Sequence, residues 1–136
     1  METTLIDSGP LVALLDARDK HHMSCRTLLG DTILPWTTTV ACLTETLYLI
    51  GKAGGFAAQG ALWQLISAGV LEVADSFEND LMSAWTYMTR FKDVPCDFAD
   101  ATLLALADRI GARRVITLDR HFYAYQVGDL HLKVLP

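Results

Sequence analysis

The stretch TTLIDSGPLVALL, residues 3–15, decides the fold class of this chain. Its first part, Thr3 to Ile6, is a short β-like run that ends at Asp7. Residues 8–10, Ser-Gly-Pro, then turn the chain into a segment whose leucines recur at helical spacing. The stretch therefore predicts a strand, a turn and a helix, with an acidic residue where the strand leaves its sheet.

The same alternation continues to the end of the chain. Further strands are predicted over Ile33–Thr38, Val70–Ala74, Arg114–Thr117 and Leu132–Leu135. Helices are predicted between them, from about Asp19 to Gly30, from Thr38 or Thr39 to Ile50 with an end at Gly51, from Phe56 to Ala68, from Phe77 to Phe91 and from Asp97 to Gly111, with a helical turn over Asp119–Tyr125. Pro35 indicates that its strand lies near an edge or begins late, because proline cannot donate to a ladder. This order predicts an α/β fold, a mostly parallel sheet with helices on both faces.

Length and composition indicate one globular domain over residues 1–136. Apolar residues make up 51% of the chain and charged residues 20%, which excludes a disordered chain. The start lacks the basic and apolar leader of a secreted protein, and the longest uncharged stretch, 54–71, is too rich in glycine and glutamine for a bilayer. Cys25, Cys42 and Cys96 have no paired spacing and are expected to be core thiols. We therefore expect a cytoplasmic protein that does not enter a membrane.

The charge balance limits how the chain could contact nucleic acid. Its net charge is −5, so it cannot coat nucleic acid by electrostatics alone. Cations near suspected active acids could instead form a local rim that follows phosphates, and the candidates are Arg90, Lys92, Arg114 and Arg120. Taken singly, each of them could equally be an ordinary solvated charge.

Two isolated acids stand in apolar surroundings. Asp7 is the only charged residue between Glu2 and Asp16, and it is either a site residue or the cap of the following helix. Glu45 is the only charged residue between Asp31 and Lys52, and no partner lies three or four positions away. A carboxylate in that setting favours a functional role with a bound cation.

Three further acids lie at predicted helix starts. Asp97 and Asp100 share the first turn of one helix, so we assign Asp97 to the cap and Asp100 to chemistry. Asp119 follows a strand and could also be a cap, and the Thr117 hydroxyl is expected to face the same pocket. In parallel sheets, ligands bind beyond the carboxyl ends of the strands, where Asp7 and Asp119 are predicted to lie.

Acids from four segments can thus converge at one edge of the sheet. Clustered carboxylates raise one another's pKa values unless a cation offsets them. Oxygen ligands alone select magnesium, with manganese as an alternative, rather than zinc. Such a metal supports phosphodiester hydrolysis, and the residue types leave one or two metals open.

Four segments in this order resemble the PIN domain, specifically the VapC-like toxins. They are Leu5–Ser8, Leu43–Glu45, Asp97–Ala101 with Leu103–Ala107, and Ile116–Asp119 with Phe122. The resemblance spans nearly the whole chain. It implies a three-layer α/β/α sandwich, a magnesium-dependent endoribonuclease acting on RNA, a homodimer, and neutralisation by a small VapB-like antitoxin.

The resemblance also implies roles for single residues. Asp7, Glu45, Asp100 and Asp119 match the family's acidic quartet of metal ligands and catalytic residues, and Ser8 and Thr117 match polar positions that support the metal or its water. Many relatives carry a further acid where this chain has His121. Asp97 could compensate as a supporting acid, although a cap is its simpler role.

Other readings of an acidic sheet edge fit less well. A phosphatase of the haloacid-dehalogenase type would need a second aspartate two positions after Asp7, where Gly9 stands. A receiver domain would need adjacent acids after the first strand and a lysine after the last, and both are missing. A PIN module that binds RNA or a partner without cutting stays open as the alternative.

Overall fold

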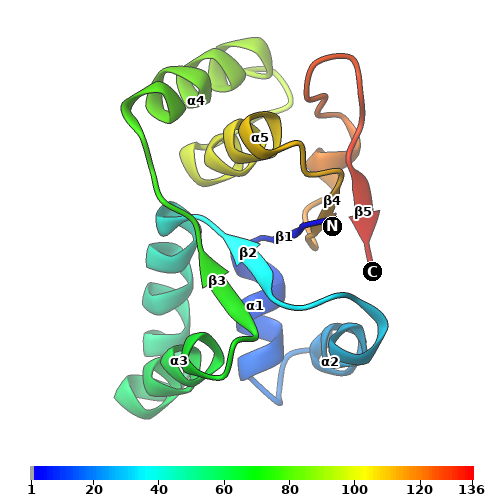
Figure 1. The fold of residues 1–136 in the computed structure, drawn as a ribbon. Helices are drawn as coiled ribbons and strands as arrows, with labels where there is room; N and C mark the ends of the chain where they lie inside the picture. Colours follow the sequence, from blue (N-terminus) through cyan, green and yellow to red (C-terminus); the bar gives the residue numbers. More distant parts are fainter. Residues whose placement is uncertain (1) are drawn as a thin grey trace.

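Five short parallel strands form one sheet in the order β3-β2-β1-β4-β5 (Figure 1). The structure, a computed structural model, describes residues 2–136. The strands are β1 (Thr4–Ile6), β2 (Trp36–Thr38), β3 (Leu71–Val73), β4 (Arg114–Ile116) and β5 (Lys133–Leu135). Leu5 pairs with Thr37 on one side and with Val115 on the other, so β1 is the central strand. The predicted parallel sheet is confirmed.

Helices cover both faces of this sheet, which gives the expected three-layer α/β/α sandwich (Figure 1). The helical elements are α1 (Ser8–Leu15), α2 (His22–Asp31), α3 (Val40–Ser67), α4 (Glu78–Arg90), α5 (Phe98–Ile110) and the 3₁₀ turn η1 (Arg120–Tyr123). Because side chains alternate along a strand, Leu5 packs with the buried residues of α4 and α5, while Ile6 packs with those of α1, α2 and α3. The sheet therefore separates two apolar cores.

The helix after β2 differs from the prediction that it ends at Gly51. Gly51 stays helical, and the backbone leaves helical geometry only at Gly55, where φ is +68° and ψ is −159°. The Gln59 side chain lies over Gly51 and donates to the Leu47 carbonyl at 3.0 Å, and a Cβ on Gly51 would lie 2.6 Å from Gln59 Nε2. Gly51 thus allows a close side-chain approach, and the kink falls at Gly55.

Two boundaries around β2 also differ. Helix α2 continues one residue past Gly30, to Asp31, and the Thr32 backbone and hydroxyl both donate to the Leu28 carbonyl, at 3.1 and 2.6 Å. Strand β2 begins only at Trp36, directly after Pro35. Of the two alternatives for this strand, the late start is correct and the edge position is wrong, since β2 lies between β1 and β3.

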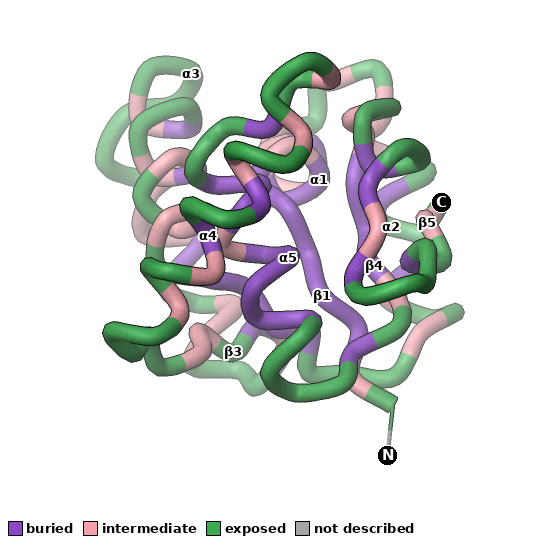
Figure 2. Tube along the Cα trace, turned by 90° about the horizontal axis from the view of Figure 1, so that it is seen from above, coloured by how far each residue is buried: buried purple, intermediate pink, exposed green. Residues whose placement is uncertain are grey.

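Burial is greatest along the central strand, which Figure 2 shows in the interior of the molecule. Cys25, Cys42 and Cys96 are buried free thiols, in line with the expectation of core cysteines. None of the helices in residues 2–136 combines the length and the apolar character needed to cross a bilayer. The chain that leaves the carboxyl end of β1 passes directly into Asp7, so the most buried strand delivers an acid to the sheet edge.

Candidate active site

The carboxyl ends of β1 and β4 lie side by side and deliver polar residues to one edge. Asp7 follows β1, and its backbone N–H donates to the Ile116 carbonyl at the end of β4 at 2.9 Å. Thr117 follows Ile116 directly. The chain crosses from β1 to β2 on one side and enters β4 on the other, so this edge is a point where the winding direction of the sheet changes. Ligands of parallel α/β sheets bind at such a point.

Asp7 caps a helix and also contacts the polar residue that follows β4. It is 6% exposed and caps α1, with its Oδ1 accepting from the Ser8 backbone N–H at 2.8 Å. Its other oxygen, Oδ2, accepts from the Thr117 hydroxyl at 2.9 Å. Both carboxylate oxygens therefore have donors from the protein, which fixes the orientation of this side chain.

Glu45 reaches the same edge from α3. It is half-buried, and one of its carboxylate oxygens accepts from the Ser8 hydroxyl. The same hydroxyl lies 3.5 Å from Asp7 Oδ1. Ser8 therefore links two acids of the predicted quartet.

Asp119 enters the site from the turn after β4. Its backbone N–H donates to the Thr117 hydroxyl at 3.1 Å, and its carboxylate accepts from the His121 backbone N–H at 2.9 Å as the cap of η1. The His121 ring lies beside it, with Nδ1 at 3.1 Å from Asp119 Oδ1. Thr117 thus contacts both Asp7 and Asp119.

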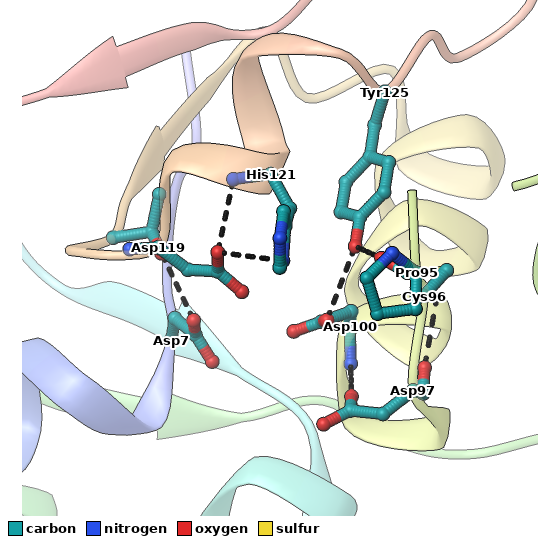
Figure 3. A network of polar contacts seen from close by, with 9 residues as sticks. Asp7, Pro95, Cys96, Asp97, Asp100, Asp119, His121 and Tyr125 are labelled. Carbon is teal, nitrogen blue, oxygen red and sulfur yellow. Dashed lines mark hydrogen bonds and ion pairs between the residues drawn. The ribbon is translucent and has the colours of Figure 1, made fainter. Parts of the chain in front are cut away.

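Asp100 and Asp97 approach from the start of α5. In Figure 3 their carboxyl groups lie across an open space from those of Asp7 and Asp119. Asp97 caps α5 by accepting from the Asp100 backbone N–H at 2.8 Å, which confirms the predicted cap. Asp100 is 7% exposed, and its Oδ2 lies 3.3 Å from the hydroxyl of Tyr125.

Burial and mutual repulsion raise the pKa values of two of these acids. Burial raises the pKa of Asp7 even though Ser8 and Thr117 donate to it, and the charges of Glu45 and Asp119 raise it further. Burial, followed by the charge of Asp97, raises the pKa of Asp100 to about 8. Asp7 and Asp119 add to that shift. The acids therefore affect one another electrostatically across the shared space.

The carboxylate oxygens present are ligands that suit a hard divalent cation. Across the described chain, none of the ion pairs brings a lysine or arginine to Asp7, Glu45, Asp100 or Asp119. The charge that would relieve their repulsion must then come from outside, and an oxygen-rich set suits magnesium or manganese. Within residues 2–136, no group of three or more His, Cys, Asp or Glu side chains lies close enough to hold a metal ion.

A groove adjoins the acids. It has a volume of about 840 Å³ and lies between α3 on one side and α4 and α5 on the other. Glu45 and Asp97 line it at the acidic end, and its apolar walls include Tyr48, Leu81 and Phe98, each of which is exposed. The groove gives an extended ligand a path that ends at the acids.

The predicted cationic rim is only partly brought together. Arg120 is exposed and directly follows Asp119. Arg90 ends α4, where it lies over the Phe91 ring and its Nη2 is 3.4 Å from Gln126 Oε1, and Lys92 is exposed two residues later. Arg114 begins β4, at the amino edge of the sheet, and pairs with Glu2. It therefore lies at the end of β4 opposite to the acids and is not part of the cationic rim.

Sequence reasoning missed Tyr125 as a site residue. Burial and the Asp100 charge raise the pKa of its hydroxyl, so it stays protonated and can donate. A buried tyrosine hydroxyl needs a partner, and that requirement was the available signal. The partner itself is 25 positions away in sequence, which no local pattern reveals.

The sequence matches a known protein family and one of its members over nearly the whole chain. The PIN domain family matches residues 4–128. Ribonuclease VapC26 of Mycobacterium tuberculosis (strain ATCC 25618 / H37Rv) is 28% identical over 134 residues, which cover 97% of this chain and 99% of the relative.

Solved structures share the fold over nearly the full length. The crystal structure of Mycobacterium tuberculosis VapC20, a sarcin-ricin loop cleaving toxin, superposes with a TM-score of 0.84 at 22% identity and covers 95% of this chain and 99% of that one. VapBC2 from Rickettsia felis, bound to a DNA fragment from its promoter, gives a TM-score of 0.70 at 16% identity, covering 98% and 99%. The order of strands and helices is therefore that of VapC structures.

Proposed function

This chain belongs to the PIN domain family, and from that premise we propose that it is a magnesium-dependent endoribonuclease, the toxin of a VapBC-type pair acting in the cytoplasm. The relative that is 28% identical over 97% of the chain is named a ribonuclease. One observation carries the proposal: buried carboxylates from separate elements meet at the carboxyl edge of β1 and β4 without a lysine or arginine to neutralise them.

In this proposal Asp7, Glu45, Asp100 and Asp119 hold the metal, with manganese as a possible replacement. Bound magnesium supplies positive charge that stabilises phosphate oxygens while the phosphodiester is hydrolysed. The chain itself prepares the ligands. Ser8 and Thr117 fix the Asp7 carboxylate through hydrogen bonds, and Thr117 also fixes the turn that carries Asp119.

We assign the RNA backbone to the cations on the acid side of the sheet. Arg120, Arg90 and Lys92 are exposed, and their charges can follow phosphates on either side of the cut. The acids repel RNA phosphates on their own, and a cation held by them would favour RNA binding. RNA binding should then depend on magnesium as well as on salt.

The direct test is cleavage of an RNA panel with magnesium or with a chelator. Wild type should cut only with metal, and Asp7→Asn and Asp119→Asn should each lose at least about 100-fold in rate, because they remove ligand charge at nearly constant volume. Asp31→Asn, an exposed acid at the end of α2, is the matched control and should keep full activity. Wild-type rates in either pocket variant would reject the assignment. RNA binding without any cleavage would instead support the non-cleaving PIN module.

The toxin part of the proposal predicts a growth phenotype. Expression without an antitoxin should arrest growth, and Glu45→Gln should relieve the arrest because it removes one ligand charge. Unimpaired growth with well-expressed wild type would count against a toxin. An antitoxin arginine in the acidic space would replace the metal's charge, since a guanidinium binds carboxylates in a bidentate way.

Exposed apolar side chains on α3 and α4 support the proposed homodimer. Tyr48, Leu81 and Trp85 each expose more than half of their surface, on α3 and α4. Exposed apolar patches of this kind favour association. Sizing of the purified chain should therefore give a dimer, and a strict monomer would reject only this part of the proposal.

A further inference from the structure

The side chain that holds Asp100 lies outside the acidic quartet. Tyr125 is 1% exposed and follows η1 by two positions. Its hydroxyl donates to the Pro95 carbonyl and lies 3.3 Å from Asp100 Oδ2 (Figure 3). Within residues 2–136, this hydroxyl is the one side-chain group within hydrogen-bond distance of the Asp100 carboxylate, and its single proton is shared with the Pro95 carbonyl. The orientation of Asp100 thus depends on a single group.

The Tyr125 ring is fixed by other aromatic rings. The Phe122 ring packs edge-on against it with a centroid distance of 5.0 Å, and the Phe91 ring lies 5.2 Å away on another side. Phe122 is itself buried. Since the ring cannot swing without breaking these contacts, the hydroxyl is held at one place beside the start of α5.

This hydroxyl also joins two segments that carry acids. Tyr125 lies six positions after Asp119, on the chain that leaves β4, whereas Asp100 and Pro95 belong to α5 and to the loop before it. The contact therefore sets how the α5 acids face the acids at the sheet edge. Asp7 has donors of its own on both oxygens and does not need such a link.

We propose that Tyr125 is a positioning residue for the metal site: its hydroxyl orients the Asp100 carboxylate toward the space shared with Asp7 and Asp119. The inference rests on the proposed function, because it assumes that Asp100 is a metal ligand. Tyr125 itself does not touch the metal or the RNA in this account. Its effect on cleavage passes through metal binding.

The test compares Tyr125→Phe with Tyr87→Phe. Tyr87, on α4, is a second buried tyrosine. Its hydroxyl lies 3.4 Å from Asp108, which belongs to α5 like Asp100 but lies near the other end of that helix. The control therefore removes the same hydroxyl from the same kind of contact, away from the site. Mn²⁺ and Mg²⁺ affinities are measured by calorimetry on each folded variant, and RNA cleavage is measured as a function of metal concentration.

We expect Tyr125→Phe to weaken metal binding by about 10–100-fold, as for other partners that orient a metal ligand, and Tyr87→Phe to stay within about twofold of wild type. The metal concentration for half-maximal cleavage should rise by the same factor, with a smaller change at saturating metal. Unchanged metal affinity in Tyr125→Phe, or an equal loss in Tyr87→Phe, would overturn the inference while the proposed function stands. Absence of metal binding in wild type would overturn both.

A measurement on the unaltered side chain covers the case in which Tyr125→Phe does not fold. The chain has four tyrosines, so wild type labelled with ¹³C at the ring carbon that bears the hydroxyl gives four signals. Single Phe variants at positions 48, 87 and 123 assign three of them. Titration with Mg²⁺ should move the Tyr125 signal and leave the Tyr87 signal in place. A Tyr125 signal that does not respond to saturating Mg²⁺ would contradict the positioning role.

Discussion

Asp7 and Asp100 are buried to nearly the same degree, 6% and 7% exposed, but the protein holds them differently. Asp7 accepts hydrogen bonds on both oxygens and caps a helix, so it has a structural role without any metal. Asp100 has one long contact to Tyr125, and its pKa is raised to about 8 by burial and by neighbouring acids. The fold therefore anchors the Asp7 side of the site, while the Asp100 side lacks a compensating charge.

The largest stability effect should come from the anchored side. Asp7→Ala removes the α1 cap and leaves the buried Thr117 hydroxyl without its acceptor, so the free energy of unfolding should fall by about 1–3 kcal/mol. Urea unfolding in chelator measures this change. Asp7→Asn is the matched control, because asparagine also caps helices and should cost less. A loss below about 0.5 kcal/mol in Asp7→Ala would mean that the fold does not anchor this side.

A second effect should appear in the pH dependence of the metal-free protein. Because the pKa of Asp100 is raised to about 8 from an ordinary value of 3.8, the folded state binds a proton in this range and the unfolded state does not. The free energy of unfolding should therefore fall as the pH rises from about 4 toward 8. The raised pKa of Asp7 acts in the same direction.

Asp100→Asn provides the control for that pH dependence. Asparagine does not titrate, so the decline in unfolding free energy between pH 4 and 8 should become shallower in this variant. Urea midpoints at fixed ionic strength are sufficient to compare the two proteins. An identical pH dependence in wild type and Asp100→Asn would show that Asp100 is not the acid whose pKa is raised.

Much of this site could be predicted from sequence because its acids are isolated in apolar segments. Asp7 follows a fully buried strand, and Glu45 has no helical partner, so each demands a local explanation. The choice between cap and site residue could not be made from the sequence, because Asp7 and Asp119 cap helical elements and also lie at the carboxyl edge of the sheet. A cap faces the carboxyl edge of the sheet whenever the helix follows a parallel strand, so one position serves both roles.

Features that depend on contacts distant in sequence were beyond prediction. The helix break falls at Gly55 instead of Gly51 because Gln59 packs over Gly51. Arg114 begins the run of residues that leads to Asp119, and the direction of β4 places it at the opposite edge of the sheet. Such positions are set by packing and strand direction, which composition and spacing do not encode.

Thermal unfolding of wild type and Asp100→Asn, with chelator and with magnesium at fixed ionic strength, tests whether the repelling carboxylates form a metal site. Binding to the folded state stabilises it by about 2.7 kcal/mol when free metal is 100 times the dissociation constant, so magnesium should raise the melting temperature of wild type. In chelator, Asp100→Asn should melt above wild type because asparagine is neutral without taking up a proton and so avoids the cost of keeping a buried carboxyl uncharged, and its gain from magnesium should shrink. Two results together would contradict the metal site. The melting temperature of wild type would not change with magnesium, and Asp100→Asn would lose about 0.3–1 kcal/mol of unfolding free energy with or without metal, as expected when a charge is removed from a helix N-terminus. Asp100 would then be a structural residue.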